Sequence, residues 1–366
     1  MRVGVVGGGQ LGRMLALAGY PLALEFLFLD RSSRAPAGQV APLLEGDLGD
    51  RACLAELASR CDVLTFDWEN VPVAALRGIG RRPPVRPSLT ALAAAQDRAS
   101  EKRLFERLGI PTTRWRSVES RRQLGEALDR IGLPGVLKTR RLGYDGKGQA
   151  IVRTREEAEH AWLALGSAPL LYEEYVPFDF EVSIVGARGR RGETAIYPLC
   201  RNIHAGGILQ VTRAPCGPPR LEAPAARYLK RTLAHFGYVG VLTIEFFVRS
   251  GRLIANEMAP RVHNSGHWTI EGAETSQFEN HLRAVCGLPL GSARTRGFSA
   301  MVNLLGTLPR RNVLLAHPGL HVHLYGKEPR PGRKLGHCTL VASTARERDA
   351  RLRRLLGELA PAIRIP

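Results

Sequence analysis

The chain has 366 residues, an apolar fraction of 44% and a formal net charge of +18. This length exceeds what one compact core usually holds, so we expect two or three domains. No apolar run reaches the roughly 20 residues that span a membrane, and the N-terminus lacks the layout of a signal peptide. The six cysteines are scattered without a Cys-x-x-Cys pair, which favours reduced thiols and a cytoplasmic location.

The excess of positive charge suggests an anionic partner, either nucleic acid or a phosphorylated small molecule. The arginines are spread along the chain, with one local concentration in residues 346–354, where acidic residues and leucines are interspersed. This mixture is typical of an amphipathic surface helix. Because no nucleic-acid-binding motif accompanies it, we do not expect nucleic acid as a partner. Because the sequence has no long apolar run, we do not expect a membrane either.

The first elements form a βαβ start. An apolar strand over residues 3–6 precedes the turn Gly7-Gly8-Gly9-Gln10-Leu11-Gly12 and a helical run, and a second strand over residues 26–29 ends in Asp30. A G-x-G-x-x-G turn in this context is typical of dinucleotide binding. A glycine-rich helix N-terminus binds any phosphate, however, so NAD and other phosphate ligands both remain open here.

Further elements follow in chain order. A strand over residues 62–66 runs into the polar residues 67–71, at the strand end where open α/β sheets place ligands. The proline-rich residues 83–87 mark a boundary. Asp97 begins a helix that Gly109 and a following proline end. From about residue 112 to 176 the pattern alternates between strands and helices, and one loop in it is rich in glycine.

That loop, residues 142–149 with the sequence Leu-Gly-Tyr-Asp-Gly-Lys-Gly-Gln, is the most informative stretch. It follows an apolar strand that ends in Lys138. Glycines let the backbone close around a ligand, and the lysines supply positive charge, a combination suited to nucleotide phosphates. It is not a P-loop, because no Gly-Lys-Ser/Thr opens a helix. On these residues alone, a plain glycine-rich hairpin turn is about equally plausible.

A predicted hairpin carries paired acids. The strand of residues 241–248 turns at residues 249–252 and returns, so that Glu245 must lie beside Asn256 or Glu257. Two adjacent carboxylates repel each other unless one takes up a proton or a cation joins them. Oxygen ligands from Glu and Asn suit Mg²⁺, which also bridges nucleotide phosphates. The alternative is an exposed hairpin with two solvated acids.

Two polar segments follow the hairpin. Residues 258–269 concentrate Arg, His, Asn and Ser, which are costly to bury unless paired, so the segment indicates a site more than a polar loop. Residues 327–337 combine basic side chains with prolines and a glycine, an arrangement that suits phosphate as well as an ordinary surface turn. His321 and His323 alternate on a strand like a metal pair, but no third ligand is evident, so we expect them to be structural.

Together these segments resemble the ATP-grasp superfamily and, within it, the N5-carboxyaminoimidazole ribonucleotide synthase family. The segments that carry the resemblance span almost the whole chain: residues 7–14, Asp97-Arg98, residues 143–149, residues 256–269 and residues 330–334. The resemblance implies a mixed α/β and α+β architecture in three parts. These are a Rossmann-like pre-ATP-grasp domain (1–96), an ATP-grasp domain (97–293, with a lid subdomain at about 112–176) and a small β-rich C-terminal domain (294–366).

The resemblance also assigns residues to sites. It places ATP between two antiparallel sheets, in contact with Arg98, Lys138, Gly143, Tyr144, Asp145, Gly146, Lys147, Gly148, Gln149, Glu173, Glu174, Tyr175, Val176, Glu181, His204, Asn256 and Glu257. It places the ribonucleotide at Gly9, Gln10, Leu11, Tyr144, Asp145, Lys147, His263, Asn264, Ser265, Lys327 and Arg333. The metal ligands would be Glu245 and Glu257, and the catalytic residues Asp145, Lys147, Arg261 and His263.

The implied reaction is ATP-dependent carboxylation of 5-aminoimidazole ribonucleotide with bicarbonate through carboxyphosphate, with Mg²⁺, or Mn²⁺ in its place, and without biotin. His263 or Asp145 would handle the amine proton. A cytoplasmic homodimer that passes its product to the mutase of the same pathway is also implied. The alternatives are another ATP-grasp ligase, such as formate-dependent glycinamide ribonucleotide transformylase, a dinucleotide-dependent oxidoreductase and a basic nucleic-acid-binding protein.

The chain departs from the family pattern at two positions. Leu142 stands where the family usually has another glycine, so we expect stiffer closure of the glycine-rich loop. Asp67 stands where glutamate is common, which changes the reach of a carboxylate near Asn70.

Overall fold

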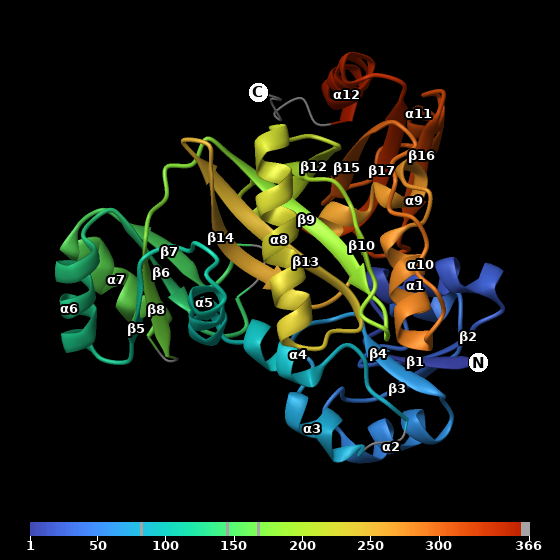
Figure 1. Cartoon of the computed structure of the whole chain (residues 1–366), viewed down its shortest axis with the longest axis horizontal. Helices are drawn as coiled ribbons and strands as arrows, with labels where there is room; N and C mark the ends of the chain where they lie inside the picture. The colour runs from blue at the N-terminus through green and yellow to red at the C-terminus, as the bar shows by residue number, and fades with distance from the viewer. Residues whose placement is uncertain (81–82, 144–145, 167–168, 360–366) are drawn as a thin grey trace.

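The computed structural model describes residues 1–80, 83–143, 146–166 and 169–359. The strands of these residues form three sheets, two with four strands and one with nine. In Figure 1 the sheet of residues 115–174 (green) lies at the left, the large sheet lies in the centre, and the N-terminal sheet (blue) lies below it. Within the described residues, no helix has both the length and the hydropathy that a membrane span needs.

The N-terminal sheet is parallel and has the order β3-β2-β1-β4. Its elements are β1 (Arg2–Val6), α1 (Gln10–Gly19), β2 (Glu25–Asp30), β3 (Leu43–Glu45), α2 (Arg51–Ser59), β4 (Val63–Phe66), α3 (Val73–Gly78) and α4 (Leu89–Ala95), with 3-10 turns at Tyr20–Leu22 and Pro36–Gln39. The predicted βαβ start is therefore confirmed. Because the strands are parallel, the glycine turn after β1 and the polar residues after β4 meet at one edge.

The lid is a separate antiparallel sheet with the order β5-β8-β6-β7, covered by two helices. Its elements are β5 (Trp115–Val118), α6 (Arg121–Ile131), β6 (Gly135–Thr139), β7 (Gln149–Val152), α7 (Arg155–Leu165) and β8 (Leu170–Glu174). Both helices begin at side-chain caps, where Ser120 accepts from Gln123 N and Thr154 accepts from Glu157 N. The glycine-rich loop connects β6 to β7, as the sequence predicts.

The large sheet has the order β14-β13-β9-β11-β12-β15-β17-β16, with β10 paired to β9. Its strands are β9 (Phe180–Arg188), β10 (Thr194–Ile196), β11 (Cys200–Ala205), β12 (Ile208–Ala214), β13 (Gly240–Arg249), β14 (Arg252–Ala259), β15 (Phe298–Leu305), β16 (Leu320–Leu324) and β17 (Lys334–Ala342). The C-terminal strands join the sheet through the antiparallel pair β12–β15. The β-rich C-terminal region therefore extends the ATP-grasp sheet instead of forming a sheet of its own.

Helices complete this part of the molecule. They are α5 (Arg98–Arg107), α8 (Pro219–His235), α9 (Thr269–Gly272), α10 (Gln277–Cys286), α11 (Arg311–Leu315) and α12 (Ala345–Leu359), with a 3-10 turn at Asn264–Gly266. The predicted helix over the arginine cluster is α12, and it buries Leu352, Leu355 and Leu356. One of its arginines is not on the surface. Arg348 is buried and donates to Asp349 Oδ1 and to the carbonyl of Pro215.

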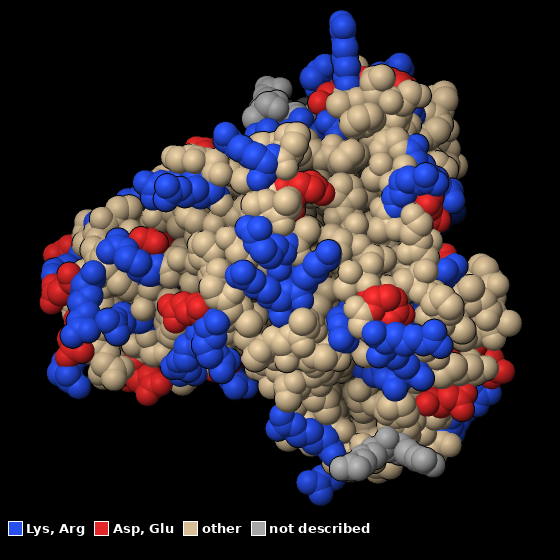
Figure 2. Space-filling model, viewed as in Figure 1, with Lys and Arg blue, Asp and Glu red and all other residues tan. Residues whose placement is uncertain are grey.

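The surface charge is spread out. Figure 2 shows lysine and arginine side chains over several parts of the face in view, with acidic side chains among them.

The six cysteines are all free thiols in this structure, as the sequence predicts.

Candidate functional site

A cavity of about 900 Å³ lies where the three parts of the chain meet. Its lining comes from the turn after β1, the residues after β4, the start of α5, the glycine-rich loop, the end of β14 with the segment that follows it, and the basic residues before β17. The structure therefore brings together segments that are separated by hundreds of residues in the sequence.

The glycine turn encloses a carboxylate. Gly7 has a φ of +102°, and a Cβ there would lie 1.9 Å from Asp67 Oδ1. Gly12 N donates to Asp67 Oδ2 at 3.1 Å, and Gly8 N donates to Asp30 Oδ2 at 2.7 Å. Burial raises the pKa of Asp67 to about 6, although amide donors of the turn oppose the shift. Two amides of the glycine turn are thus already bonded to protein carboxylates, one of them to Asp30, the acid of the dinucleotide fingerprint.

The predicted substrate residues of this turn, Gly9, Gln10 and Leu11, do line the cavity. The Gln10 side-chain oxygen accepts a hydrogen bond from Lys327, which comes from the opposite end of the chain. Burial, with the charge of Arg333 next, lowers the pKa of Lys327 to about 8. Arg333 also lines the cavity and donates to the carbonyl of Glu328 at 3.1 Å.

An ion pair joins the N-terminal part to the segment after β14. Arg261 Nη2 lies 2.7 Å from Glu69 Oε2, and both side chains line the cavity. The Nε atom of Arg261 is buried and has no hydrogen-bond partner among the described residues. A buried donor without a partner is costly, so Arg261 is suited to a ligand that accepts from it.

The paired acids of the hairpin lie where the sequence predicts. Glu245 and Glu257 are direct partners in the β13–β14 register, next to a β-bulge. Burial raises the pKa of Glu245 to about 7, and the charge of Glu257 adds to this. For Glu257 burial acts in the same direction, but Arg98 at 3.2 Å and Lys138 together hold its pKa below the usual range. Without a cation, therefore, one carboxylate of the pair tends to take up a proton.

These residues fit a magnesium site that shares its ligands with a nucleotide. The Oδ1 atom of Asn256 is buried and unpartnered in the described part of the chain. No group of three or more His, Cys, Asp or Glu side chains among the described residues has metal-binding geometry. A hard ion between Glu245 and Glu257 would thus take most of its oxygen ligands from phosphates and water, which is how Mg²⁺ is commonly held.

Sequence reasoning missed Glu101, which lies directly behind this pair. It is buried on α5, and its Oε1 accepts from Met258 N at 2.6 Å. Burial, and then the charge of Glu257, raises its pKa to about 8, so the carboxyl is mostly neutral at pH 7. A signal was present, because Glu101 shares the apolar face of α5 with Leu104 and Phe105, where a solvated acid is not expected.

A buried ion cluster fixes the predicted phosphate lysine. Glu173 bonds to Lys138, lies 2.9 Å from Lys102 Nζ, and accepts from Thr113 Oγ1 at 2.7 Å. Burial acts to raise the pKa of Glu173, but the two lysines prevail and hold it well below its usual range, so the carboxylate stays ionised. Sequence reasoning also missed Lys102 and Thr113, since neither lies in a recognisable motif.

The neighbouring residues of β8 show how an adenine could be held. The Glu174 side chain forms an ion pair with Arg114 at 2.8 Å. The Glu173 side chain forms ion pairs with Lys102 and Lys138. Both carboxylates are therefore occupied, which leaves backbone groups for a ligand. Tyr175 is exposed and Val176 is buried just past the strand end.

The described residues of the glycine-rich loop reach from the lid to the large sheet. A Cβ at Gly146 would lie 3.1 Å from Gly206 O, in the turn between β11 and β12. Gly143 and Lys147 line the cavity, and Gln149 begins β7. Gly146 and Gly148 have φ values of +75° and +71°, which glycine adopts freely. The predicted residues Tyr144 and Asp145 lie outside the described residues.

Glu181 and His204 form a pair on adjacent strands. His204 Nδ1 lies 2.8 Å from Glu181 Oε2. Burial acts to lower the pKa of His204, but the bond to Glu181 and the charge of Glu245 prevail and raise it to about 9. The imidazole is therefore cationic at pH 7 and faces the acidic pair of the hairpin.

The segment after β14 turns sharply through the 3-10 helix of residues 264–266. His263 Nε2 lies 3.4 Å from Glu245 Oε1, and burial together with the charge of Arg261 keeps the pKa of His263 well below its usual value. Both side-chain amide atoms of Asn264 are buried without a partner in the described chain. Ser265 is fully buried and bonds to His263.

Comparison with known proteins agrees with this geometry. Three family models match: the ribonucleotide synthetase preATP-grasp domain at residues 1–96, the ATP-grasp domain at residues 103–278 and the phosphoribosylaminoimidazole carboxylase C-terminal domain at residues 299–351. The N5-carboxyaminoimidazole ribonucleotide synthase of Pseudomonas aeruginosa is 50% identical over 352 residues, which cover 96% of this chain and 98% of the relative. The chain belongs to the N5-carboxyaminoimidazole ribonucleotide synthase family.

Solved structures of this family superimpose closely. The N5-carboxyaminoimidazole ribonucleotide synthetase of Thermus thermophilus has a TM-score of 0.94 and 51% identity, over 100% of this chain and 99% of that one. The N5-carboxyaminoimidazole synthase of Aspergillus clavatus, in complex with ADP and 5-aminoimidazole ribonucleotide, has a TM-score of 0.91 and 30% identity, over 97% of each chain. The predicted ATP-grasp architecture, with its N-terminal pre-ATP-grasp and C-terminal parts, is thus confirmed.

Membership of the N5-carboxyaminoimidazole ribonucleotide synthase family decides among the alternatives. The oxidoreductase interpretation accounts only for the glycine turn, and in the structure that turn binds Asp67. Of the two histidines on β16, His323 bonds to Glu271 at 2.7 Å and stacks on His337, which is consistent with a structural role. His321 is exposed and pairs with Thr339 in the sheet register, so its structural role stays a prediction.

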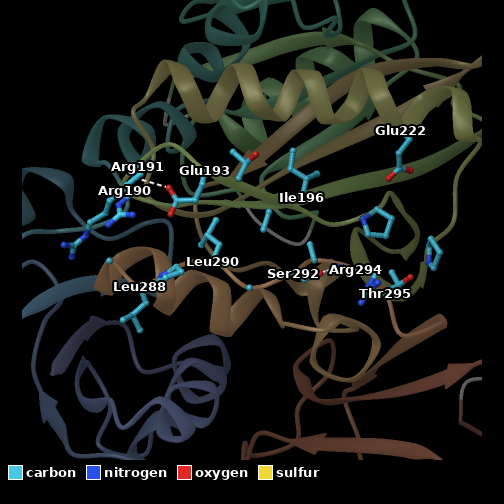
Figure 3. Close-up of a pocket in the computed structure, with 18 residues that line it drawn as sticks. Arg190, Arg191, Glu193, Ile196, Glu222, Leu288, Leu290, Ser292, Arg294 and Thr295 are labelled. Carbon is cyan, nitrogen blue, oxygen red and sulfur yellow. Dashed lines mark hydrogen bonds between the residues drawn. The ribbon is translucent and has the colours of Figure 1, made fainter.

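A second cavity, of about 1210 Å³, lies apart from the candidate site and is shown in Figure 3. Residues 190–198 of the large sheet form one side of it and the segment after α10, residues 287–295, forms the other. In the close-up, Glu193 and Arg191 point toward each other at one end, and Glu222 lies at the other. None of the predicted site residues lines it, whereas several of them line the cavity at the junction of the three parts.

Proposed function

We propose that this chain catalyses the ATP-dependent carboxylation of 5-aminoimidazole ribonucleotide with bicarbonate to N5-carboxyaminoimidazole ribonucleotide, releasing ADP and phosphate, in purine biosynthesis. One observation carries the proposal. Glu257 of the acidic pair, the cations Arg140 and Lys147, and the unpartnered polar groups of Arg261 and Asn264 line a single cavity, and Glu245 lies beside Glu257 in the hairpin register. A ligase that joins a nucleotide to a second substrate needs such convergence.

ATP would lie between the lid sheet and the large sheet. Arg98 and Lys138 would contact its phosphates, and the loop of residues 143–149, including Tyr144, Asp145, Gly146, Gly148 and Gln149, would close over them. Glu173, Glu174, Tyr175 and Val176 would hold the adenine mainly through backbone groups, with Glu181 and His204 at the ribose side. The occupied carboxylates of Glu173 and Glu174 support this assignment.

Mg²⁺, or Mn²⁺ in its place, would be held by Glu245 and Glu257 with Asn256 nearby. When bound, the ion would neutralise the negative charge that develops on phosphoryl transfer. The raised pKa of Glu245 supports the assignment, since a cation would relieve the repulsion that causes part of the shift.

The ribonucleotide would occupy the side of the cavity near the glycine turn. Its position would be set by residues from all three parts of the chain: Gly9, Gln10, Leu11, Tyr144, Asp145, Lys147, His263, Asn264, Ser265, Lys327 and Arg333. The contact between Gln10 and Lys327 supports this placement, because it closes the cavity with residues from both ends of the chain. The unpartnered amide of Asn264 and the Nε atom of Arg261 supply polar groups for the ligand.

The chemistry follows from the groups assembled. Bicarbonate is a poor electrophile, and transfer of the γ-phosphate converts it to carboxyphosphate. Lys147, Arg261 and Arg98 would stabilise the charge on the transferred group. Carboxyphosphate hydrolyses readily, so the closed loop must exclude water until the ribonucleotide amine attacks the carbon or the CO₂ released from it. Asp145 and His263 are the two candidates for handling the amine proton.

The biological setting is proposed from the family as well. We expect a cytoplasmic homodimer whose product is consumed by the mutase of the same pathway, with neither nucleic acid, membrane nor biotin involved. Sedimentation analysis of the purified protein tests the dimer directly.

One assay tests the activity. The protein is mixed with ATP, Mg²⁺, bicarbonate and aminoimidazole ribonucleotide, and phosphate release is followed with each component omitted in turn. We expect release that depends on both bicarbonate and the ribonucleotide. Release that depends on neither would contradict the proposal, and release with formate and glycinamide ribonucleotide would identify the other ATP-grasp ligase.

A further inference from the structure

Behind His263, four buried side chains form a continuous hydrogen-bond chain. Thr212 Oγ1 donates to Asn202 Oδ1 at 3.0 Å, and Asn202 Nδ2 donates to Ser183 Oγ at 3.0 Å. Ser183 Oγ donates to Ser265 Oγ at 2.7 Å, and Ser265 Oγ lies 2.9 Å from His263 Nδ1. The first three residues come from adjacent strands, β12, β11 and β9, so the sheet itself sets their spacing.

A backbone amide sets the direction of this chain. Ser265 N points at His263 Nδ1 at 3.3 Å, and because an amide N–H can only donate, Nδ1 must be the acceptor. An Nδ1 atom that accepts carries no hydrogen, so the Ser265 hydroxyl must donate to it. Ser265 Oγ is then left as the acceptor for Ser183, and Ser183 as the acceptor for the Asn202 amide. Each hydrogen bond of the chain therefore has a defined donor and acceptor. The orientation of the Asn202 side-chain amide follows from these assignments.

The backbone of His263 is fixed independently. The Gln277 side chain is fully buried, accepts from His263 N at 2.9 Å and donates to His263 O at 2.6 Å. A shift of the His263 backbone would break both bonds to Gln277, and a flip of the ring would break those from Ser265 to Nδ1. Each of these buried hydrogen bonds is costly to leave unmade.

We propose that Ser265, Ser183, Asn202 and Thr212 are positioning residues that fix His263 as the neutral tautomer with its hydrogen on Nε2, so that His263 donates a hydrogen bond into the active site and does not accept the amine proton. The Nδ1 lone pair faces Ser265 and the buried chain behind it, and Nε2 already carries a hydrogen, so neither ring nitrogen presents a free lone pair to the substrate amine. Because the role of His263 in carboxylation rests on the proposed function, so does the catalytic half of this inference. The tautomer itself does not depend on that function.

The tautomer is measured without any substrate. The full-length protein is labelled with ¹⁵N at both ring nitrogens of its ten histidines, and the His263 signals are identified by their loss in His263→Gln. We expect a hydrogen on Nε2 and none on Nδ1. A hydrogen on Nδ1 in an active enzyme would overturn this inference alone. The expected tautomer in a protein without carboxylation activity would count against the proposed function instead.

Two variants test whether the chain sets the tautomer. Ser183→Ala removes the donor that keeps Ser265 Oγ an acceptor, so the Ser265 hydroxyl can turn and Nδ1 keeps only the longer bond from Ser265 N at 3.3 Å. We therefore expect the form with a hydrogen on Nδ1 to appear as a minor population. We expect kcat to fall about 3- to 10-fold, the effect of losing about one hydrogen bond, while KM for ATP stays within about twofold. Ser265→Ala should act in the same direction and more strongly, because it removes the direct donor to Nδ1.

The matched control is Thr243→Val. Thr243 is a fully buried residue on the neighbouring strand β13, and its hydroxyl has no partner among the described residues. Its replacement should change neither the ring signals of His263 nor turnover. Unchanged signals and turnover in Ser183→Ala would overturn the proposal. If a variant failed to fold, the wild-type spectrum would still test the tautomer.

Discussion

At the scale of single residues, the site is governed by charges that burial forces into contact. Glu245 and Glu257 face each other across one hairpin, and Glu101 lies behind them. Three carboxyl groups are thus brought together, and two of them have raised pKa values for the same reason, loss of water. Arg98 and Lys138 offset the charge on Glu257, and His204 acts on Glu245, but burial still keeps the pKa of Glu245 raised. The site is consequently arranged for one more cation.

The substitution Glu257→Gln tests this arrangement. It keeps the shape of the side chain but removes the charge that pairs with Arg98 and the proposed metal ligand. We expect turnover to fall by at least about 10²-fold and the dependence on Mg²⁺ to weaken. Thermal unfolding should stay close to that of the parent, because Glu257 is at a partly exposed site. Glu25→Gln, at a surface ion pair, is the control, and normal rates in Glu257→Gln would remove the metal assignment.

His204 gives a prediction for pH. Its folded pKa is raised to about 9, above the ordinary value of 6.5. The stability it contributes is therefore fully present below about pH 6.5 and is lost as the pH rises through 9. We expect the loss in unfolding free energy caused by His204→Gln to be larger at pH 6 than at pH 9.5, as measured by denaturant titration. A pH-independent loss in His204→Gln would contradict the assignment.

At the scale of elements, Leu142 is the position of the glycine-rich loop where the resemblance led us to expect a glycine. Leu142 has a φ of +63° and is 71% exposed, so a branched side chain occupies a left-handed conformation without packing against the protein. Such a conformation costs a non-glycine residue roughly 1 kcal/mol or more. The loop thus carries strain next to Gly143, and the stiffer closure expected from the sequence stays a prediction.

Replacing Leu142 with glycine should relieve that strain. If loop closure limits turnover, we expect Leu142→Gly to raise kcat by up to about threefold, and phosphate release without the ribonucleotide to change with it. Leu142→Ala is the matched control, since it removes the side chain but keeps the Cβ that causes the strain. Equal effects of glycine and alanine, in steady-state assays of both reactions, would show that the side chain matters and the backbone does not.

At the scale of the whole molecule, one core joins the three parts. A single buried cluster includes Phe26 of the N-terminal sheet, Val185 and Trp268 of the central part, and Met301 and Tyr325 of the C-terminal part. The large sheet continues across the same boundary through β12 and β15. The cavity at their junction is therefore held by shared packing, and the N-terminal and C-terminal parts are not free to separate from it.

Trp268→Ala tests this coupling. Trp268 is fully buried, its ring meets Tyr197 edge-on, and its Nε1 donates to Cys200 Sγ at 3.1 Å. We expect a loss of about 3–5 kcal/mol in unfolding free energy, seen as one shifted transition in denaturant by both fluorescence and circular dichroism. Leu315→Ala, at a side chain that is 68% exposed, should cost almost nothing. Separate transitions for separate parts would contradict a shared core.

Much of this was readable from the sequence. The βαβ start, the glycine-rich loop between two strands, the facing acids of the hairpin and the leucine face of α12 all follow from local pattern and short-range geometry, because neighbours in the chain decide them. The resemblance to the family rests on the same kind of local segments. The sequence by itself thus determined the fold class, the acidic pair and the glycine-rich loop.

Only the tertiary structure decided the rest, because burial and pairing depend on distant segments. Glu101, Lys102 and Thr113 carry no motif, and their roles appear only where α5 packs behind β14 and beneath β8. The continuation of the large sheet into the C-terminal strands and the hydrogen-bond chain behind His263 likewise require strands that are far apart in sequence to lie side by side. Local pattern fixes which groups are present, whereas their charge and hydrogen-bond direction are set by what surrounds them once water is excluded.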